Sequence, residues 1–117
     1  MKNNIYHITE VELKKYLPQE TEKNKIISID LKRIKNWKEY SIIIENTLEF
    51  PRPVDGSPNR FLDWMRDLTW YDYDRYDILI YHYNHFVAKN PNDAHQIYDE
   101  FKKFILPFWE YEVSHTV

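Results

Sequence analysis

Two short apolar segments, separated by helix-forming sequence, place the strongest limit on the fold. Residues 25–31 (KIISIDL) are rich in β-branched side chains, which is typical of a strand. Residues 76–83 (YDILIYHY) are apolar on both faces at their centre, which indicates a strand covered on both sides. Because helical stretches join the two segments, we expect a parallel sheet with right-handed connections.

Two helical stretches lie between these segments. The first has Asn36 as its predicted N-cap, and Phe50-Pro51 ends it. Its apolar residues recur at helical spacing and predict a buried stripe: Trp37, Tyr40, Ile44 and Leu48. The second stretch follows a loop with proline and glycine, and it is expected to begin at Ser57-Pro58, a good pair for the N-cap and first turn.

The two ends of the chain add further elements. Thr9 and Glu12 have the spacing of a capping box, which predicts a short N-terminal helix. Pro91 is predicted to start another helix, which Pro107 stops, with four residues facing inward: Ile97, Phe101, Phe104 and Ile105. Residues 108–113 (FWEYEV) alternate apolar and acidic side chains, as expected for a half-buried third strand.

These elements predict an α/β fold, a three-stranded parallel sheet packed by helices. At 117 residues the chain suffices for one domain with one core. We expect the domain to span residues 25–117, preceded by a short N-terminal extension, residues 1–24. There is no cysteine, which excludes disulfides and thiolate metal sites. No apolar run is long enough for a membrane span or a signal peptide, so a cytoplasmic protein without a membrane partner is expected.

The charge of the chain is mildly negative and unevenly placed. The net charge is −3, and the acidity gathers in the middle and C-terminal parts. Residues 51–83 contain six Asp against four Arg and no Lys. Direct binding of nucleic acid is therefore not expected, since phosphate binding needs a basic patch. A basic protein partner fits this distribution, because complementary charge speeds encounter.

Neither a metal site nor a cofactor is expected. His82 and His85 leave the second strand without a third ligand nearby, so a turn or the end of a strand explains them better. An alternating set of aspartates resembles calcium ligands but lacks the EF-hand glycine and closing glutamate: Asp72, Asp74 and Asp77. One glycine in the whole chain cannot build a loop that cradles phosphates.

The helix that begins at Pro58 is expected to have two unlike faces. One is apolar and predicted to be buried: Phe61, Leu62, Met65 and Leu68. The other is acidic and aromatic: Arg60, Asp63, Trp64, Asp67 and Tyr71. The simpler interpretation is a solvated face, partly neutralised by Arg60 and Arg66. The functional one is a docking surface for a basic partner, since two carboxylates one turn apart repel each other and do not stabilise the helix.

A longer pattern favours the docking surface. The strand KIISIDL, a helix ending in LEFP, a loop with glycine and then N-x-x-x-D-W-M-R-D-L-T-W resemble the barstar family of intracellular ribonuclease inhibitors. In that family the second helix and the loop before it block the active site of a small basic ribonuclease, with acidic side chains where RNA phosphates would sit. The resemblance covers Lys25 to the C-terminus, and its specific part is Phe50–Trp70. It implies a three-stranded parallel sheet and a protein that is not an enzyme.

Two alignments carry the family's acidic residues onto this helix. One puts them at Asn59 and Asp63, the other at Asp63 and Asp67, and the first preserves the loop length better. The resemblance implies this partner-binding set: Asp63, Asn59, Asp67, Trp64, Arg60, Val54, Asp55, Gly56 and Ser57. Pro53 and Val54 stand where family members have loop tyrosines. Glu100 is a candidate for the acidic residue that the family has on a later helix.

Three hypotheses about the function follow from these sequence features. The leading hypothesis is a non-catalytic protein that binds and blocks a small basic ribonuclease or nuclease toxin. The second is a binding or immunity module of the same fold for a protein that is not a ribonuclease, motivated by the missing loop tyrosines. The third is an enzyme with Asp63 and Asp67 as acid and base, which requires a concave pocket at that face.

Overall fold

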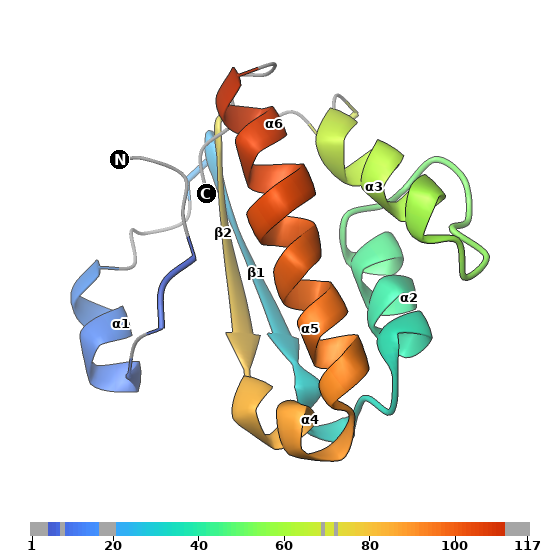
Figure 1. The fold of residues 1–117 in the computed structure, drawn as a ribbon. Coiled ribbons are helices and arrows are strands. Elements are labelled where there is room, and N and C mark those ends of the chain that lie inside the picture. The colour runs from blue at the N-terminus through green and yellow to red at the C-terminus, as the bar shows by residue number, and fades with distance from the viewer. Residues whose placement is uncertain (1–4, 8, 17–20, 69, 72, 112–117) are drawn as a thin grey trace.

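The computed structural model of the protein describes residues 5–7, 9–16, 21–68, 70–71 and 73–111. Two parallel strands and a set of helices make an α/β arrangement (Figure 1). The α-helices and strands are α1 (Glu10–Tyr16), β1 (Asn24–Asp30), α2 (Trp37–Thr47), α3 (Pro58–Asp67), β2 (Arg75–Tyr81), α4 (Tyr83–Lys89), α5 (Pro91–Asp99) and α6 (Leu106–Tyr111). A 3₁₀ turn, η1 (Leu31–Arg33), follows β1, and a π-helix, η2 (Glu100–Ile105), joins α5 to α6.

The sheet is smaller than predicted. β1 and β2 pair in parallel with Ile27 beside Ile78, and they are the two strands of the described residues. The third strand, predicted at 108–113, is wrong for residues 108–111, which belong to α6, while residues 112 and 113 lie outside the described part. In Figure 1, α2, α3, α5 and α6 lie to one side of the strands and α1 to the other.

The proline at 107 does not stop the last helix, because the helix is widened just before it. The Leu106 N–H donates to the carbonyl oxygen of Phe101, five residues back, so the preceding turn is a π-helix. Proline has no N–H to contribute to a regular helical ladder, and an irregular turn accommodates it. Helix therefore continues through Pro107, and Phe104, predicted to face inward, is 44% exposed.

The second strand also ends earlier than predicted. β2 stops at Tyr81, and His82 takes a left-handed conformation (φ 62°) that turns the chain into the unpredicted helix α4. Of the β2 residues, Tyr76 is buried and the others are half-buried. The expectation of a strand fully covered on both faces is therefore not met.

The helices between the strands form as predicted. The Asn36 side chain caps α2 by accepting the Glu39 N–H at 2.9 Å, and all four residues of the predicted stripe on this helix are buried. On α3 three residues of the apolar face are buried and Leu62 is half-buried. Together they form one core with β1 and the C-terminal helix, including Ile27, Ile29, Phe101, Ile105 and Trp109.

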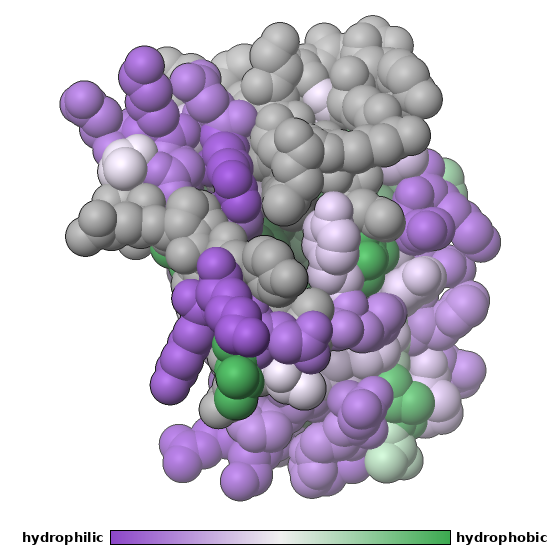
Figure 2. Space-filling view, turned by 90° about the vertical axis from the view of Figure 1, so that its left-hand side faces the viewer, coloured by the Kyte–Doolittle hydropathy of each residue, from purple (hydrophilic) through white to green (hydrophobic). Residues whose placement is uncertain are grey.

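The N-terminal extension also contacts the domain. Thr9 and Glu12 form the predicted capping box, with the Glu12 N–H donating to Thr9 Oγ1 at 3.2 Å. Ile5 packs against the core, and the His7 ring stacks on Tyr98 of α5 at 6.3 Å between centroids. Figure 2 shows the α1 side, where the described residues are mostly hydrophilic with small separate apolar groups. In the described part no helix has the length and apolar character needed to cross a membrane.

Candidate partner-binding site

The loop before α3 is held by hydrogen bonds from its backbone, one of them to a side chain of α2. The Val54 N–H donates to Glu45 Oε1 of α2 at 2.6 Å, and the Ser57 N–H donates to the Val54 carbonyl at 3.0 Å. Asp55 and Gly56 both have positive φ, 52° and 72°, which turns the chain sharply. Val54 itself is 1% exposed. Its side chain therefore supports the loop from inside, whereas Asp55 is exposed and Gly56 and Ser57 are half-exposed.

The start of α3 uses the predicted cap. Ser57 Oγ accepts the Arg60 N–H at 3.3 Å, and Pro58 fills the first turn. The Arg60 guanidinium then reaches back to Asp55 Oδ2 at 3.3 Å, so this arginine is paired with the loop. Asn59 and Arg60 are exposed beside that pair. The loop and the first turn of α3 thus form one continuous surface.

Aromatic side chains cap the far ends of α2 and α3. Trp109 of α6 donates its Nε1–H to the Met65 carbonyl at 2.7 Å. Trp70 Nε1 and the Tyr71 hydroxyl donate to the carbonyls of Leu48 (2.9 Å) and Thr47 (3.3 Å) at the end of α2. The last carbonyls of a helix have no partner within it, so these bonds satisfy groups that otherwise need water. They also join α3 and the residues after it to α6 and α2.

Trp64 belongs to both the surface and the core. Its side chain is half-buried and meets the Trp70 ring edge-on, 5.4 Å between centroids. Such an edge-to-face pair is one of the favoured aromatic geometries. Part of the ring remains at the surface of α3, beside the acidic residues.

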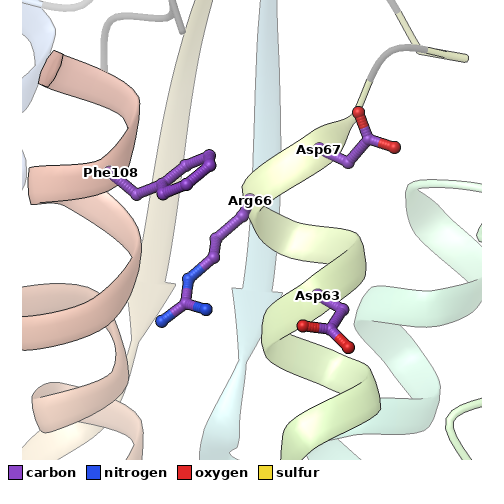
Figure 3. Close-up of a pocket in the computed structure, with 4 residues that line it drawn as sticks. All are labelled: Asp63, Arg66, Asp67 and Phe108. Atoms are coloured by element: carbon purple, nitrogen blue, oxygen red, sulfur yellow. The ribbon is translucent and has the colours of Figure 1, made fainter. Parts of the chain in front are cut away.

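Asp63 and Asp67 are exposed and unpaired. Neither carboxylate has a hydrogen bond or ion pair with any residue that the structure describes. The arginines nearest in sequence are occupied elsewhere: Arg60 with Asp55, and Arg66 through Nε with the Phe104 carbonyl at 3.1 Å. Figure 3 shows Arg66 extending from α3 toward the helix of Phe108. Both carboxylates are therefore open to solvent and to a partner.

A small pocket lies between α3 and α6. It has a volume of about 310 Å³ and is lined by Asp63, Arg66, Asp67 and Phe108 (Figure 3). The Arg66 guanidinium lies over the Phe108 ring, 5.6 Å from its centroid. Pockets for small molecules begin at about this size. Among the residues that the structure describes, no histidine, lysine or nucleophile lines it, so it suits a side chain of a partner better than a reacting substrate.

Glu100 lies inside the protein, away from this surface. It is 5% exposed, and its Oε1 accepts the Trp37 Nε1–H at 2.6 Å. Burial raises the pKa of this carboxyl to about 7, although the bond from Trp37 acts in the opposite direction. The nearby Tyr40 hydroxyl is buried and has no hydrogen-bond partner among the described residues. Glu100 therefore cannot supply the acidic contact considered for it.

Two of the residues considered as metal ligands, His82 and Asp77, pair with neighbouring side chains. His82 Nδ1 lies 2.6 Å from Asp30 Oδ1 across the ends of the two strands. Arg75 binds Asp77 with two hydrogen bonds, and Asp72 lies outside the described residues. In the described part no three His, Asp or Glu side chains gather as metal ligands would.

The C-terminal helix contributes to this surface, which the sequence patterns do not predict. Arg66 was considered only as a neutralising charge, while Phe104 was assigned to the core and Phe108 and Trp109 to a strand. The structure brings Phe108 and Trp109 against α3. The spacing of Phe104 and Phe108 would have indicated one helical face if helix had been continued through Pro107.

Comparison with known proteins places this α/β protein in a family. The model of the family described as Barstar (barnase inhibitor) matches residues 24–114, which is most of the chain. The chain therefore belongs to the Barstar family, and the resemblance found in the sequence is confirmed. No curated protein and no solved structure matches it.

Proposed function

We propose that this protein is a non-catalytic inhibitor that binds a small basic ribonuclease or nuclease toxin and blocks its active site. The observation that carries the proposal is the pair of exposed, unpaired carboxylates on α3, Asp63 and Asp67. Membership of a family described as barnase inhibitors supports the same function. A basic active site that binds phosphates would attract these carboxylates, which take the place of phosphate charges.

The binding surface of the proposal consists of α3 and the loop before it. Asp63 is its centre, since both alignments with the family place an acidic contact there. Asp67, Asn59, Arg60 and Trp64 surround it, and the exposed turn at Asp55–Ser57 completes it. Val54 contributes by holding that turn from the core. We also propose that residues 1–24 are an extension of a domain that spans residues 25–117, and that the protein is cytoplasmic.

The test is inhibition of RNA hydrolysis by a panel of small basic ribonucleases that includes barnase. Wild-type protein should inhibit at least one of them at equal molar concentration. Asp63→Asn should weaken that inhibition by on the order of 100-fold or more. The reason is that losing one charge of a charged pair that is buried in the complex costs several kcal/mol of binding free energy. The control is Glu22→Gln, which removes the same charge from an exposed residue before β1. Wild-type protein that inhibits none of the panel contradicts the proposal.

The second candidate is a binding or immunity module of the same fold for a protein that is not a ribonuclease. It is favoured by the loop, where Pro53 and the buried Val54 stand in place of the family's tyrosines. A module of this kind would form a stoichiometric complex with a basic protein and leave RNA hydrolysis unchanged. The concave pocket that the enzyme hypothesis requires is present, but among the described residues its lining has two exposed aspartates, an arginine and a phenylalanine, without a histidine or a nucleophile, and this does not favour catalysis.

A further inference from the structure

One residue of α2, Glu45, is bonded to both ends of the segment that leads into the proposed binding surface. The Phe50 N–H donates to the Glu45 carbonyl oxygen at 3.0 Å, and the Val54 N–H donates to Glu45 Oε1 at 2.6 Å. The segment 50–54 is therefore held at its start by the backbone of Glu45 and at its end by the side chain. Figure 1 shows this connection between α2 and α3 at the right of the molecule.

The first of these bonds belongs to the end of α2. Glu49 has a positive φ of 54°, and its N–H donates to the Asn46 carbonyl oxygen at 3.4 Å. Together with the bond between Phe50 and the Glu45 carbonyl, this makes a Schellman motif, a common way for a helix to end. That motif accounts for the backbone bond of Glu45 but not for its side chain, which reaches a residue nine positions later.

The carboxylate of Glu45 holds the residue at which the exposed turn begins. Val54 is 1% exposed, and its carbonyl oxygen accepts the Ser57 N–H at 3.0 Å. Asp55 and Gly56 lie between these two residues, and both have positive φ. The position of the turn thus depends on Val54, and the position of Val54 depends on Glu45. A carboxylate is a strong acceptor for a backbone N–H, which suits this role.

A loop that has its binding shape before the complex forms contributes more to affinity, because it does not have to be ordered on binding. From these bonds we infer that Glu45 is a positioning residue of the binding surface, whose carboxylate holds Val54 so that the turn at Asp55–Ser57 is in place for the partner. This inference rests on the proposed function and adds to it a residue that acts through the loop. The simpler interpretation is that Glu45 only satisfies a buried N–H, which predicts a change in stability and none in binding.

The experiment compares Glu45 variants by their inhibition constants for a ribonuclease that the wild-type protein inhibits. Glu45→Ala removes the acceptor and should raise the constant by on the order of tenfold, because fewer molecules have the loop in place. Glu45→Gln should restore most of the inhibition, since its amide oxygen still accepts the N–H although the charge is lost. Deuterium exchange of the Val54 N–H in the free protein should be faster in Glu45→Ala than in Glu45→Gln.

The matched control breaks the same kind of bond at the other end of α2. Asp93 Oδ2 accepts the Trp37 N–H at 2.7 Å, so here too a carboxylate binds a backbone N–H that is distant in sequence. Asp93→Ala should lower the urea midpoint of unfolding, as Glu45→Ala does. It should leave the inhibition constant unchanged, because neither Asp93 nor Trp37 belongs to α3 or to the loop before it.

The outcomes separate this inference from the proposed function. If wild-type protein inhibits and Asp63→Asn does not, but Glu45→Ala inhibits as wild type, the inference is overturned and the function stands. If Glu45→Gln inhibits as poorly as Glu45→Ala, the charge of this residue matters and not its bond to the loop. If Asp93→Ala weakens inhibition as much as Glu45→Ala, lost stability explains both and the inference is overturned. If no ribonuclease is inhibited, the inference and the function both fail.

Discussion

The carboxylates of Asp63 and Asp67 on α3 and the carboxylate of Glu100 differ in what surrounds them. This difference suits the two aspartates to binding a partner and gives Glu100 a structural role. Asp63 and Asp67 stand in water without a partner, so their charge is available to another protein. Glu100 is enclosed by the core and accepts a hydrogen bond from Trp37, and its pKa is raised because water is excluded. From the sequence all three are acidic residues in helices. Their surroundings come from residues far away along the chain.

The raised pKa of Glu100 predicts that stability falls as the pH rises from about 4.5 to about 7. In this window the folded protein keeps the proton and the unfolded chain releases it, so folding is favoured most at the acidic end. The contribution lost is about 3 kcal/mol for a shift of this size. Tyr40 is the titratable group of α2 that faces this carboxyl, and its own pKa is raised by burial and by Glu100.

The measurement is urea unfolding of wild-type protein and Glu100→Gln between pH 4.5 and pH 8. Glutamine can still accept the Trp37 N–H but does not titrate. The difference in unfolding free energy between the two proteins should therefore change with pH across this window and be constant above it. A difference that stays the same from pH 4.5 to pH 8 would show that Glu100 titrates normally in the folded protein.

At the scale of elements, the two ends of α3 are set by contacts with other parts of the chain. Its start is set by Ser57 and by the loop turn at Gly56, and its end by Trp109 and by the left-handed Leu68. The start was predicted from the sequence, because a cap and a proline act on neighbouring residues. The end could not be predicted, since Trp109 reaches it from the other end of the chain.

Gly56→Ala is predicted to lower the unfolding free energy by about 1 kcal/mol, because alanine is strained at positive φ. A Cβ atom there would lie 3.8 Å from the side chain of Lys38, an ordinary contact, so the cost is in the backbone and not in packing. Gly56→Asn should cost less, since asparagine tolerates this conformation better. Urea unfolding measures both variants. Equal stability of Gly56→Ala and wild type would mean that the loop can leave this conformation freely.

At the scale of the whole molecule, the proposed function depends on how the exposed carboxylates of α3 would attract a basic partner. The net charge is only −3, but α3 presents two unpaired carboxylates on one face. Long-range attraction of this kind is screened within about 10 Å at 0.1 M salt. It affects the rate of association more than the rate of dissociation.

Stopped-flow association with an inhibited ribonuclease should therefore slow by on the order of tenfold or more between 0.05 and 0.5 M salt. Dissociation should change much less. Asp67→Asn should flatten the salt dependence of association, and Glu22→Gln, with the same change in net charge, should flatten it less. An association rate that is independent of salt for wild type would contradict electrostatic attraction by α3.

The sequence by itself determined β1, α2, the start of α3 and membership of the Barstar family. The signals for these are local: a β-branched run, helical spacing with side-chain caps, and a continuous motif from Phe50 to Trp70. Each depends on residues within a few turns of one another, so no tertiary contact is needed to recognise it.

The tertiary structure alone decided the form of the C-terminal region and the partners of the charged side chains. The alternation in 108–113 suits a strand, yet the π-helix carries helix through Pro107 and lets Trp109 enter the core. The same packing draws Arg66 to Phe104 and leaves Asp63 and Asp67 exposed and unpaired. Which charges remain free depends on contacts between α3 and a helix about 40 residues away in sequence, and local patterns do not encode such contacts.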